Sequence, residues 1–173
     1  MYKKVKQVTY SFSEQELVDC VYGNAVNGCD GGWPTKAFRY VKNKQILTEA
    51  SYPYTGKDQN CKKVRKTSNT NYPISTYRYL NFAGDCLKAQ KKLAIQPLAI
   101  AVDASRWGSY SSGIFACKST AINHGVLLVG YDANGNWKIK NSWGTNWGES
   151  GYIRIGPGNS CSVCGDLWKT DIA

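Results

Sequence analysis

The stretch HGVLLVGYDANGNWKIKNS, residues 124–142, decides the fold. Two runs rich in branched and aromatic side chains flank the polar sequence DANGN, residues 132–136, and an Asn-Gly pair between two such runs is a strong β-hairpin signal. The segments LAIAVDA, residues 98–104, and GYIRIG, residues 151–156, have the same strand-like character. The second half of the chain is therefore predicted to form an antiparallel sheet.

The first half carries helix signals instead. Ser13 and Glu16 have the spacing of a capping box, which opens a short helix over residues 13–20. A second helix is expected over residues 34–44, where a proline occupies the first position, and a third over residues 85–95. The stretch 52–79 is punctuated by proline, glycine and asparagine and is expected to be a loop.

Helices followed by strands indicate an α+β fold with two layers that can face each other. We expect residues 1–79 to form a partial helical layer that includes the glycine-rich loop NGCDGG, and residues 80–173 to form an antiparallel β-rich layer.

The charge of the chain does not point to nucleic acid. Twenty-two Lys and Arg against twelve Asp and Glu give a formal charge of +10, but the basic residues are scattered and are not interleaved with aromatic residues. No run approaches the ~20 apolar residues that a membrane span needs. The first ten residues, MYKKVKQVTY, lack the apolar core of a secretory signal peptide, whereas seven cysteines suggest a disulfide framework and an oxidising compartment.

His124 is the only histidine, and it begins one strand of the predicted hairpin, whereas Asn141 ends the other. A neutral imidazole acts as a general base when its ring is held in one orientation, and an asparagine amide can hold it without adding charge. Trp143 and Trp147 follow at once, and their indoles could shield that hydrogen bond from water. The alternative is a hydrogen-bonded rim histidine, a turn asparagine and two core tryptophans.

Five segments in order resemble the papain-like cysteine peptidases, the family of papain and cathepsin L. They are SEQELVDC, NGCDGG, YPYTG, NHGVLLVGY and KNSWGTNWGESGYIRI, and the resemblance runs from about Ser13 to the C-terminus. It implies a papain-like fold whose helical layer is incomplete, packed against a β-barrel-like layer. The activity implied is peptide-bond hydrolysis by acyl transfer to a thiol.

The resemblance also implies roles for residues of this chain. His124 matches the catalytic base, Asn141 its orienting amide and Trp143 the indole that covers the pair. The glycines that hydrogen-bond the substrate backbone correspond to Gly31 and Gly32, since a side chain there would block the approach. The main side-chain pocket of the family corresponds to Trp33, Ala101, Ile122 and Gly125, although Trp33 alone could also be a plain surface aromatic.

The nucleophile of the family has no counterpart here. In the family it lies in a C-G-[SA]-C-[WY] segment about 130 to 150 residues before the histidine, and this sequence contains no such segment. The glutamine of the oxyanion hole belongs to the same region. On its own, the chain is therefore expected to be inactive.

The resemblance also implies how the cysteines pair. The resemblance suggests that Cys20 pairs with Cys61, that Cys117 pairs with Cys161 or Cys164, and that the remaining one of those two pairs with Cys86. This leaves Cys29 unpaired, since its family partner lies just before the nucleophile. A zinc site at Cys161 and Cys164 lacks a second ligand pair, so we expect neither a metal nor a cofactor.

Three interpretations stay open. The chain is the larger part of a two-chain peptidase, a non-catalytic homologue that serves as a structural or peptide-binding subunit of a larger assembly, or a truncated sequence. In each case a polypeptide is expected to cover the incomplete helical layer, and a peptide would be the substrate of a completed site. The family suggests a lysosomal or secreted protein, but no signal peptide is present, so the compartment stays unassigned.

Overall fold

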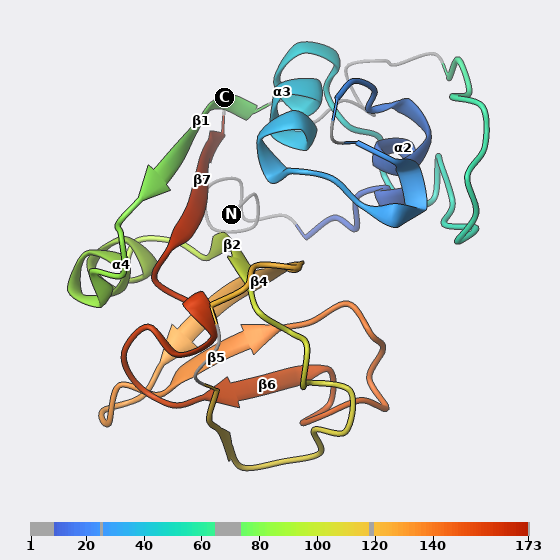
Figure 1. Cartoon of the computed structure of the whole chain (residues 1–173). Coiled ribbons are helices and arrows are strands. Elements are labelled where there is room, and N and C mark those ends of the chain that lie inside the picture. The colour runs from blue at the N-terminus through green and yellow to red at the C-terminus, as the bar shows by residue number, and fades with distance from the viewer. Residues whose placement is uncertain (1–8, 25, 65–73, 118–119, 173) are drawn as a thin grey trace. The chain divides into compact units, whose positions relative to one another are not determined.

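The structure, a computed structural model, describes residues 9–24, 26–64, 74–117 and 120–172. The chain divides into two compact units (Figure 1). The first comprises Met1–Arg78 together with Thr170–Ala173, and the second comprises Tyr79–Lys169. Each unit is described by itself below. The basic N-terminal residues 1–8 lie outside the described residues.

The first unit contains the two helices expected there, α2 (Glu14–Cys20) and α3 (Pro34–Lys44), with the 3-10 turn η1 (Gly28–Asp30) between them. Ser13 caps α2, because its hydroxyl accepts a hydrogen bond from the Glu16 backbone N–H at 2.9 Å. The second half of the capping box is not formed. The Glu16 carboxylate instead accepts from the Leu47 N–H and the Tyr40 hydroxyl, while the Ser13 N–H donates to the Leu47 carbonyl.

Buried polar groups hold the loops of the first unit. The Gln15 amide donates to Asp19 and to the Lys57 carbonyl, and its oxygen accepts from the backbone N–H groups of Thr55 and Gly56. The apolar cluster beside it is small and centres on Val41 and Ile46. Together with this polar network, the Cys20–Cys61 disulfide, which ties the end of α2 to a loop residue 41 positions later, helps to order the described part of the unit.

Within the described residues, the sheet has seven strands in the order β1-β7-β2-β4-β5-β6-β3. Their bounds are β1 (Ile74–Asn81), β2 (Leu98–Val102), β3 (Ile114–Phe115), β4 (His124–Tyr131), β5 (Trp137–Lys140), β6 (Tyr152–Ile155) and β7 (Asp166–Ile172). The predicted hairpin joins β4 and β5, which pair antiparallel around the turn at Asp132. The sheet is mixed, because β3 pairs parallel with β6, and the order of its strands does not close into a full barrel.

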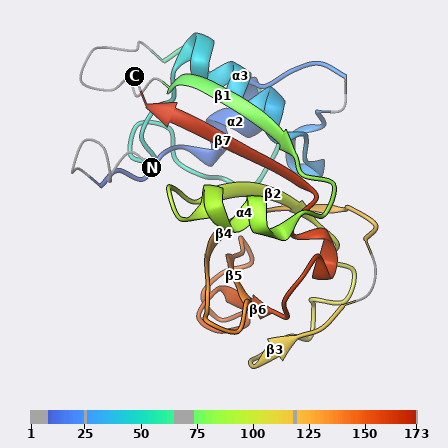
Figure 2. The same ribbon diagram turned by 90° about the vertical axis from the view of Figure 1, so that its left-hand side faces the viewer.

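One expectation for the first half was wrong. Residues 74–79 were expected to be a loop, but they belong to β1, which lies beside β7 (Figure 2). The partner strand is about ninety residues away in sequence, so no local turn signal marks the pairing, and β1 is only half-buried. Residues 65–73 lie outside the described residues. Helix α4 (Cys86–Leu93) forms behind its Asp85 cap and ends two residues before the expected Ile95.

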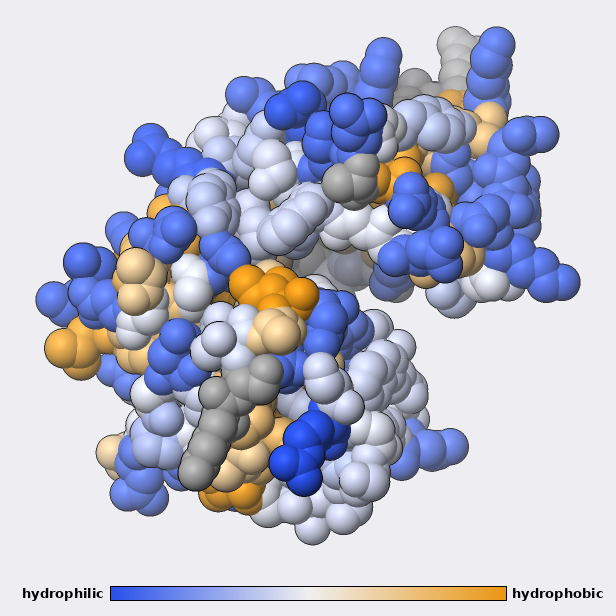
Figure 3. All heavy atoms as spheres, in the orientation of Figure 1, coloured by the Kyte–Doolittle hydropathy of each residue, from blue (hydrophilic) through white to orange (hydrophobic). Residues whose placement is uncertain are grey.

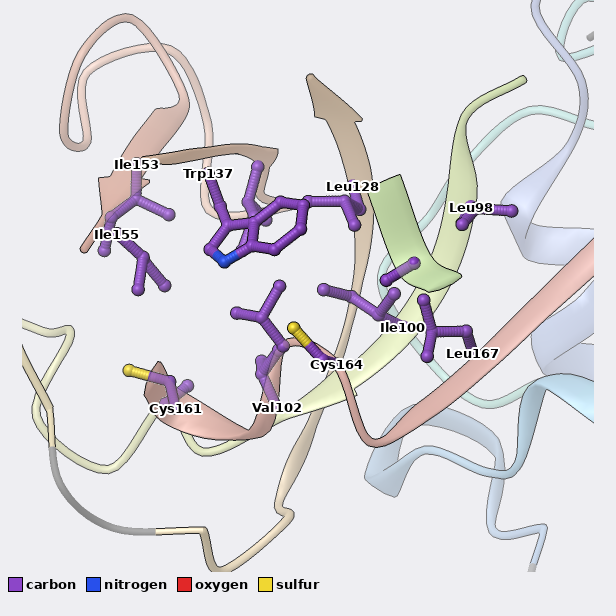
Figure 4. Packing of buried hydrophobic residues seen from close by; sticks show 14 of the residues in the cluster. Leu98, Ile100, Val102, Leu128, Trp137, Ile153, Ile155, Cys161, Cys164 and Leu167 are labelled. Carbon is purple, nitrogen blue, oxygen red and sulfur yellow. The ribbon is translucent and has the colours of Figure 1, made fainter. Parts of the chain in front are cut away.

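The core of the second unit is built from alternate strand residues (Figure 4). Leu98, Ile100 and Val102 of β2 all have no exposed surface, as the period of two requires. Trp137 of β5 is equally buried, and its indole N–H donates to the Gly158 carbonyl at 2.9 Å. The Cys117–Cys161 disulfide fastens the 3-10 turn η2 (Ser160–Ser162) to this core, and the Cys86–Cys164 disulfide fastens the segment just after that turn.

Hydrophilic side chains cover much of the face seen in Figure 3, with small apolar patches between them. Among the described residues, no helix has both the length and the apolar character to cross a membrane.

Candidate active site

The β4–β5 hairpin of the second unit brings His124 and Asn141 together. His124 is the first residue of β4, and Asn141 follows the last residue of β5. Because Leu127 of β4 pairs with Lys140 of β5, the start of one strand and the end of the other meet at the same edge. The distance between His124 Nε2 and Asn141 Oδ1 is 2.8 Å, a hydrogen bond.

The surroundings of Asn141 determine which ring nitrogen carries the proton. The same atom of Asn141 lies 2.8 Å from the Ser142 backbone N, and because a backbone N–H can only donate, this atom must be the amide oxygen Oδ1. His124 Nε2 must therefore be the protonated nitrogen, which leaves the lone pair of a neutral imidazole on Nδ1. The amide is 8% exposed, and its Nδ2 has no hydrogen-bond partner among the described residues.

Two indoles contact the imidazole. The centroid of the Trp143 ring lies 5.1 Å from that of His124, and the Trp107 ring stands edge-on to it at 6.2 Å. Trp147 stacks on Trp107 and stands edge-on to Trp143, and no contact between Trp147 and His124 is found among the described residues. Trp143 thus lies beside the imidazole, and its shielding of the His124–Asn141 bond from water stays a prediction.

Trp107, which has no exposed surface, was not singled out in the sequence. It lies five residues beyond Val102, the residue of β2 that pairs with His124 in the sheet. An aromatic residue shortly after that strand was the one available signal, and it becomes informative only once the register between β2 and β4 is known.

Residues 142–151, here called the tryptophan loop, carry Trp143 and Trp147. The loop closes on itself, because the Asn141 N–H donates to the Gly151 carbonyl and the Gly151 N–H donates to the Trp147 carbonyl. Glu149 anchors its end with two hydrogen bonds from the Arg154 guanidinium at 2.6 and 2.8 Å. These bonds lower the pKa of Glu149 to about 2, against a smaller opposing effect of desolvation.

The predicted pocket residues of the second unit lie on β2 and at the start of β4, the strand that begins with the base. Ala101 of β2 is buried and pairs with Gly125 of β4, which is the residue after His124. Ile122 precedes the strand and is 38% exposed. The fold thus brings Ala101, Gly125 and Ile122 close to His124 within one unit.

The remaining predicted binding residues lie in the first unit. Gly31 has a φ of 96°, a conformation that favours glycine, and open space where a Cβ would stand. Gly32 forms an isolated bridge with Val26, and Trp33, 46% exposed, precedes α3. All three line a cavity of about 130 Å³ with apolar residues of the same unit, including Leu17, Val18, Val21 and Ala37.

The second unit offers no thiol, since each of its four cysteines is in a disulfide. Of the seven cysteines in the sequence, only Cys29 of the first unit is unpaired, and it is exposed. Desolvation and then the Asp58 carboxylate raise the pKa of its thiol, which disfavours the reactive thiolate. Within the described ranges, no group of three or more His, Cys, Asp or Glu side chains is arranged to hold a metal ion.

Comparison with known proteins points to one family. A model described as papain family cysteine protease matches residues 1–168. Cathepsin L 1 of Paramecium tetraurelia is 40% identical over 155 residues, which cover 90% of this chain and 48% of that protein. Digestive cysteine proteinase 1 of Homarus americanus is 41% identical over 170 residues, covering 90% of this chain and 52% of that protein. The chain thus spans about half the length of the curated relatives it matches.

Solved structures agree with this picture. A cysteine protease of Carica candamarcensis superimposes with a TM-score of 0.86 and 37% sequence identity. The match covers 98% of this chain and 81% of that one.

Proposed function

The chain belongs to the papain family of cysteine proteases, with relatives of the cathepsin L type, and from this premise we propose that it supplies the general base of a cysteine endopeptidase. The nucleophilic thiol of that peptidase comes from a polypeptide segment outside these 173 residues. The observation that carries the proposal is the 2.8 Å hydrogen bond between His124 Nε2 and Asn141 Oδ1.

The proposed roles follow from the tautomer. With Nε2–H held by Asn141, the lone pair on His124 Nδ1 accepts the proton of an incoming thiol. The thiolate attacks the peptide carbonyl, the C–N bond breaks, and the imidazolium returns the proton to the leaving amine. In the second half His124 takes a proton from water, whose oxygen attacks the thioester. The thiol is then released with the proton that the imidazolium gives back.

The thiols of this chain do not support a self-contained enzyme. Disulfides bind six of the seven cysteines, and desolvation and the Asp58 carboxylate beside Cys29 raise the pKa of its thiol, which disfavours the thiolate form. The isolated chain is therefore proposed to be inactive.

We further propose that a second polypeptide segment covers the apolar cavity of the first unit. Leu17 and Val18 of α2 are only half-buried, and Val21 and Ala37 line the same cavity. Apolar side chains on a helix are stabilised when another element packs on them. A segment that brought its own apolar face to this cavity would complete the helical layer.

A second candidate is a non-catalytic homologue that binds peptides or serves as a structural subunit. The observation in its favour is that the described second unit contains a base but no free thiol. Both candidates need a partner polypeptide, but only the peptidase needs His124 as a base.

The test compares native material with the isolated chain in hydrolysis of an unstructured peptide. The peptidase proposal predicts turnover by the native assembly, loss of turnover in His124→Ala, and no turnover by the isolated chain. Asn134→Ala, in the exposed hairpin turn at the far end of β4, is the matched control and should keep full activity. Native material that binds its partner but never hydrolyses peptide would favour the non-catalytic subunit.

A further inference from the structure

Asn123, the residue before His124, is exposed to solvent, but its backbone and its side chain are both hydrogen-bonded to the strand β2 and the turn after it. Its backbone N–H donates to the Val102 carbonyl at 3.0 Å, and its side-chain Oδ1 accepts from the Ala104 N–H at 2.9 Å. Its Nδ2 donates to the Ser105 hydroxyl at 2.7 Å and to Asp103 Oδ1 at 3.3 Å. Because the amide oxygen of Asn123 faces the Ala104 N–H, its amide nitrogen must face hydrogen-bond acceptors. The turn after β2 provides two, Asp103 Oδ1 and the Ser105 hydroxyl.

Asp103 organises that turn. Asp103 is only 3% exposed. Its Oδ1 accepts one hydrogen bond from Asn123 Nδ2 and one from the Ser105 backbone N–H at 2.9 Å. The Asp103 N–H donates to the Cys161 carbonyl at 3.0 Å. Since Cys161 is buried and in a disulfide, Asp103 is tied to the rigid core of the second unit.

The same turn also positions an aromatic neighbour of the imidazole. The Ala104 carbonyl accepts from the Trp107 N–H at 3.0 Å, and the Trp107 ring stands edge-on to His124 at an angle of 88°. The Trp107 carbonyl in turn accepts from the Trp147 indole N–H at 3.1 Å. The turn 103–107 therefore reaches His124 by two routes, one through Asn123 and one through Trp107.

We propose that Asp103 is a positioning residue for His124. The buried carboxylate of Asp103 orders the turn 103–107, and this turn fixes both Asn123, the residue just before β4, and the Trp107 ring. Asp103 acts through these neighbours and does not touch the reacting atoms. The inference rests on the proposed function in one respect, that His124 is the residue worth positioning.

The test uses the single histidine of the chain. With ¹⁵N-histidine incorporated, the one imidazole N–H signal belongs to His124, and its exchange with solvent reports how well the Nε2–H bond to Asn141 is sheltered. Asp103→Ala removes the shared acceptor and is expected to speed this exchange about tenfold, as the loss of one hydrogen bond would. Asp103→Asn keeps an oxygen at the Oδ1 position and should exchange as slowly as the native chain.

Asp132→Ala is the matched control. Like Asp103, Asp132 accepts two hydrogen bonds through its Oδ1 in a turn of the second unit, here from the backbone N–H groups of Asn134 and Asn136, but it lies beyond the other end of β4. Removing it should leave the exchange of His124 unchanged. If Asp103→Ala does not fold, Asn123→Ala carries the test, because it removes the other partner of the same bond and should have the same effect.

Exchange in folded Asp103→Ala at the native rate would overturn the inference. Equal acceleration in Asp132→Ala would also overturn it, since the effect would then be a general loosening of the unit. The measurement needs no substrate and no thiol. A negative result would therefore leave the peptidase proposal intact, and an absence of peptidase activity would leave this inference intact.

Discussion

Replacing Glu149 by glutamine removes the charge that anchors the end of the tryptophan loop. In the native chain the carboxylate accepts two hydrogen bonds from Arg154 and one from the Gly113 N–H. The Arg154 bonds are the main reason that the pKa of Glu149 falls from its ordinary 4.5 to about 2. The variant should therefore be less stable at neutral pH, and the tryptophan loop that places Trp143 beside His124 should be held less firmly.

The magnitude follows from the pKa. The interval from 4.5 to about 2 corresponds to an upper bound of about 3 to 4 kcal/mol, at 1.36 kcal/mol for each pH unit. The Arg154 side chain is 42% exposed, so solvent screens the pair and we expect about 1 kcal/mol. Because the folded pKa is the lower one, this stabilisation is fully present above pH 4.5 and is lost as the pH falls towards about 2.

Urea unfolding at several pH values measures the effect. The free energy of unfolding of Glu149→Gln should be about 1 kcal/mol lower than that of the native chain at pH 7, and the two free energies should converge near pH 2. Arg154→Lys, which keeps the charge but loses the two-pronged geometry, should fall between them. A difference between Glu149→Gln and the native chain that stays constant from pH 7 to pH 2 would refute the reasoning, because a charge-dependent bond cannot behave in that way.

Further predictions concern the tryptophan loop, the core and the site. Gly148→Ala should cost at least about 1 kcal/mol more than Gly144→Ala in thermal unfolding: both have positive φ, but only at Gly148 would a Cβ meet a backbone oxygen, at 2.6 Å. Equal costs would contradict the close contact. Ile139→Ala, at a fully buried position, should cost about 3 kcal/mol in urea, and less than about 1 would place Ile139 outside the core. Asn141→Ala should abolish the sheltered imidazole N–H signal of His124, and a persistent signal would mean that another group accepts this proton.

Local signals in the sequence were enough to predict the helices and the hairpin, because the groups that stabilise these elements lie within a few residues of one another. The capping residue Ser13, the proline at the start of α3 and the Asn-Gly turn of the hairpin each act within a few residues. The proximity of His124 and Asn141 could be predicted from the hairpin alone, since in a β-hairpin the start of the first strand lies beside the end of the second.

Strand pairings between segments far apart in the sequence could not be predicted from local signals. Strand β1 depends on β7, which is about ninety residues away, and the parallel pair of β3 and β6 needs a crossover that no turn residue marks. Trp107 meets His124 only because β2 and β4 pair in one particular register. The orientation of the Asn141 amide, which selects Nδ1 as the base, depends on the Ser142 N–H and is likewise invisible in the sequence.

The most direct test of the central claim is to identify which cysteine reacts with a peptide-based thiol alkylating agent in the native assembly. Mass spectrometry of the labelled peptides should place the label on a cysteine outside these 173 residues, and His124→Ala should prevent labelling while leaving the assembly intact. Label on Cys29, dependent on His124, would contradict the account, because the chain would then contain its own nucleophile.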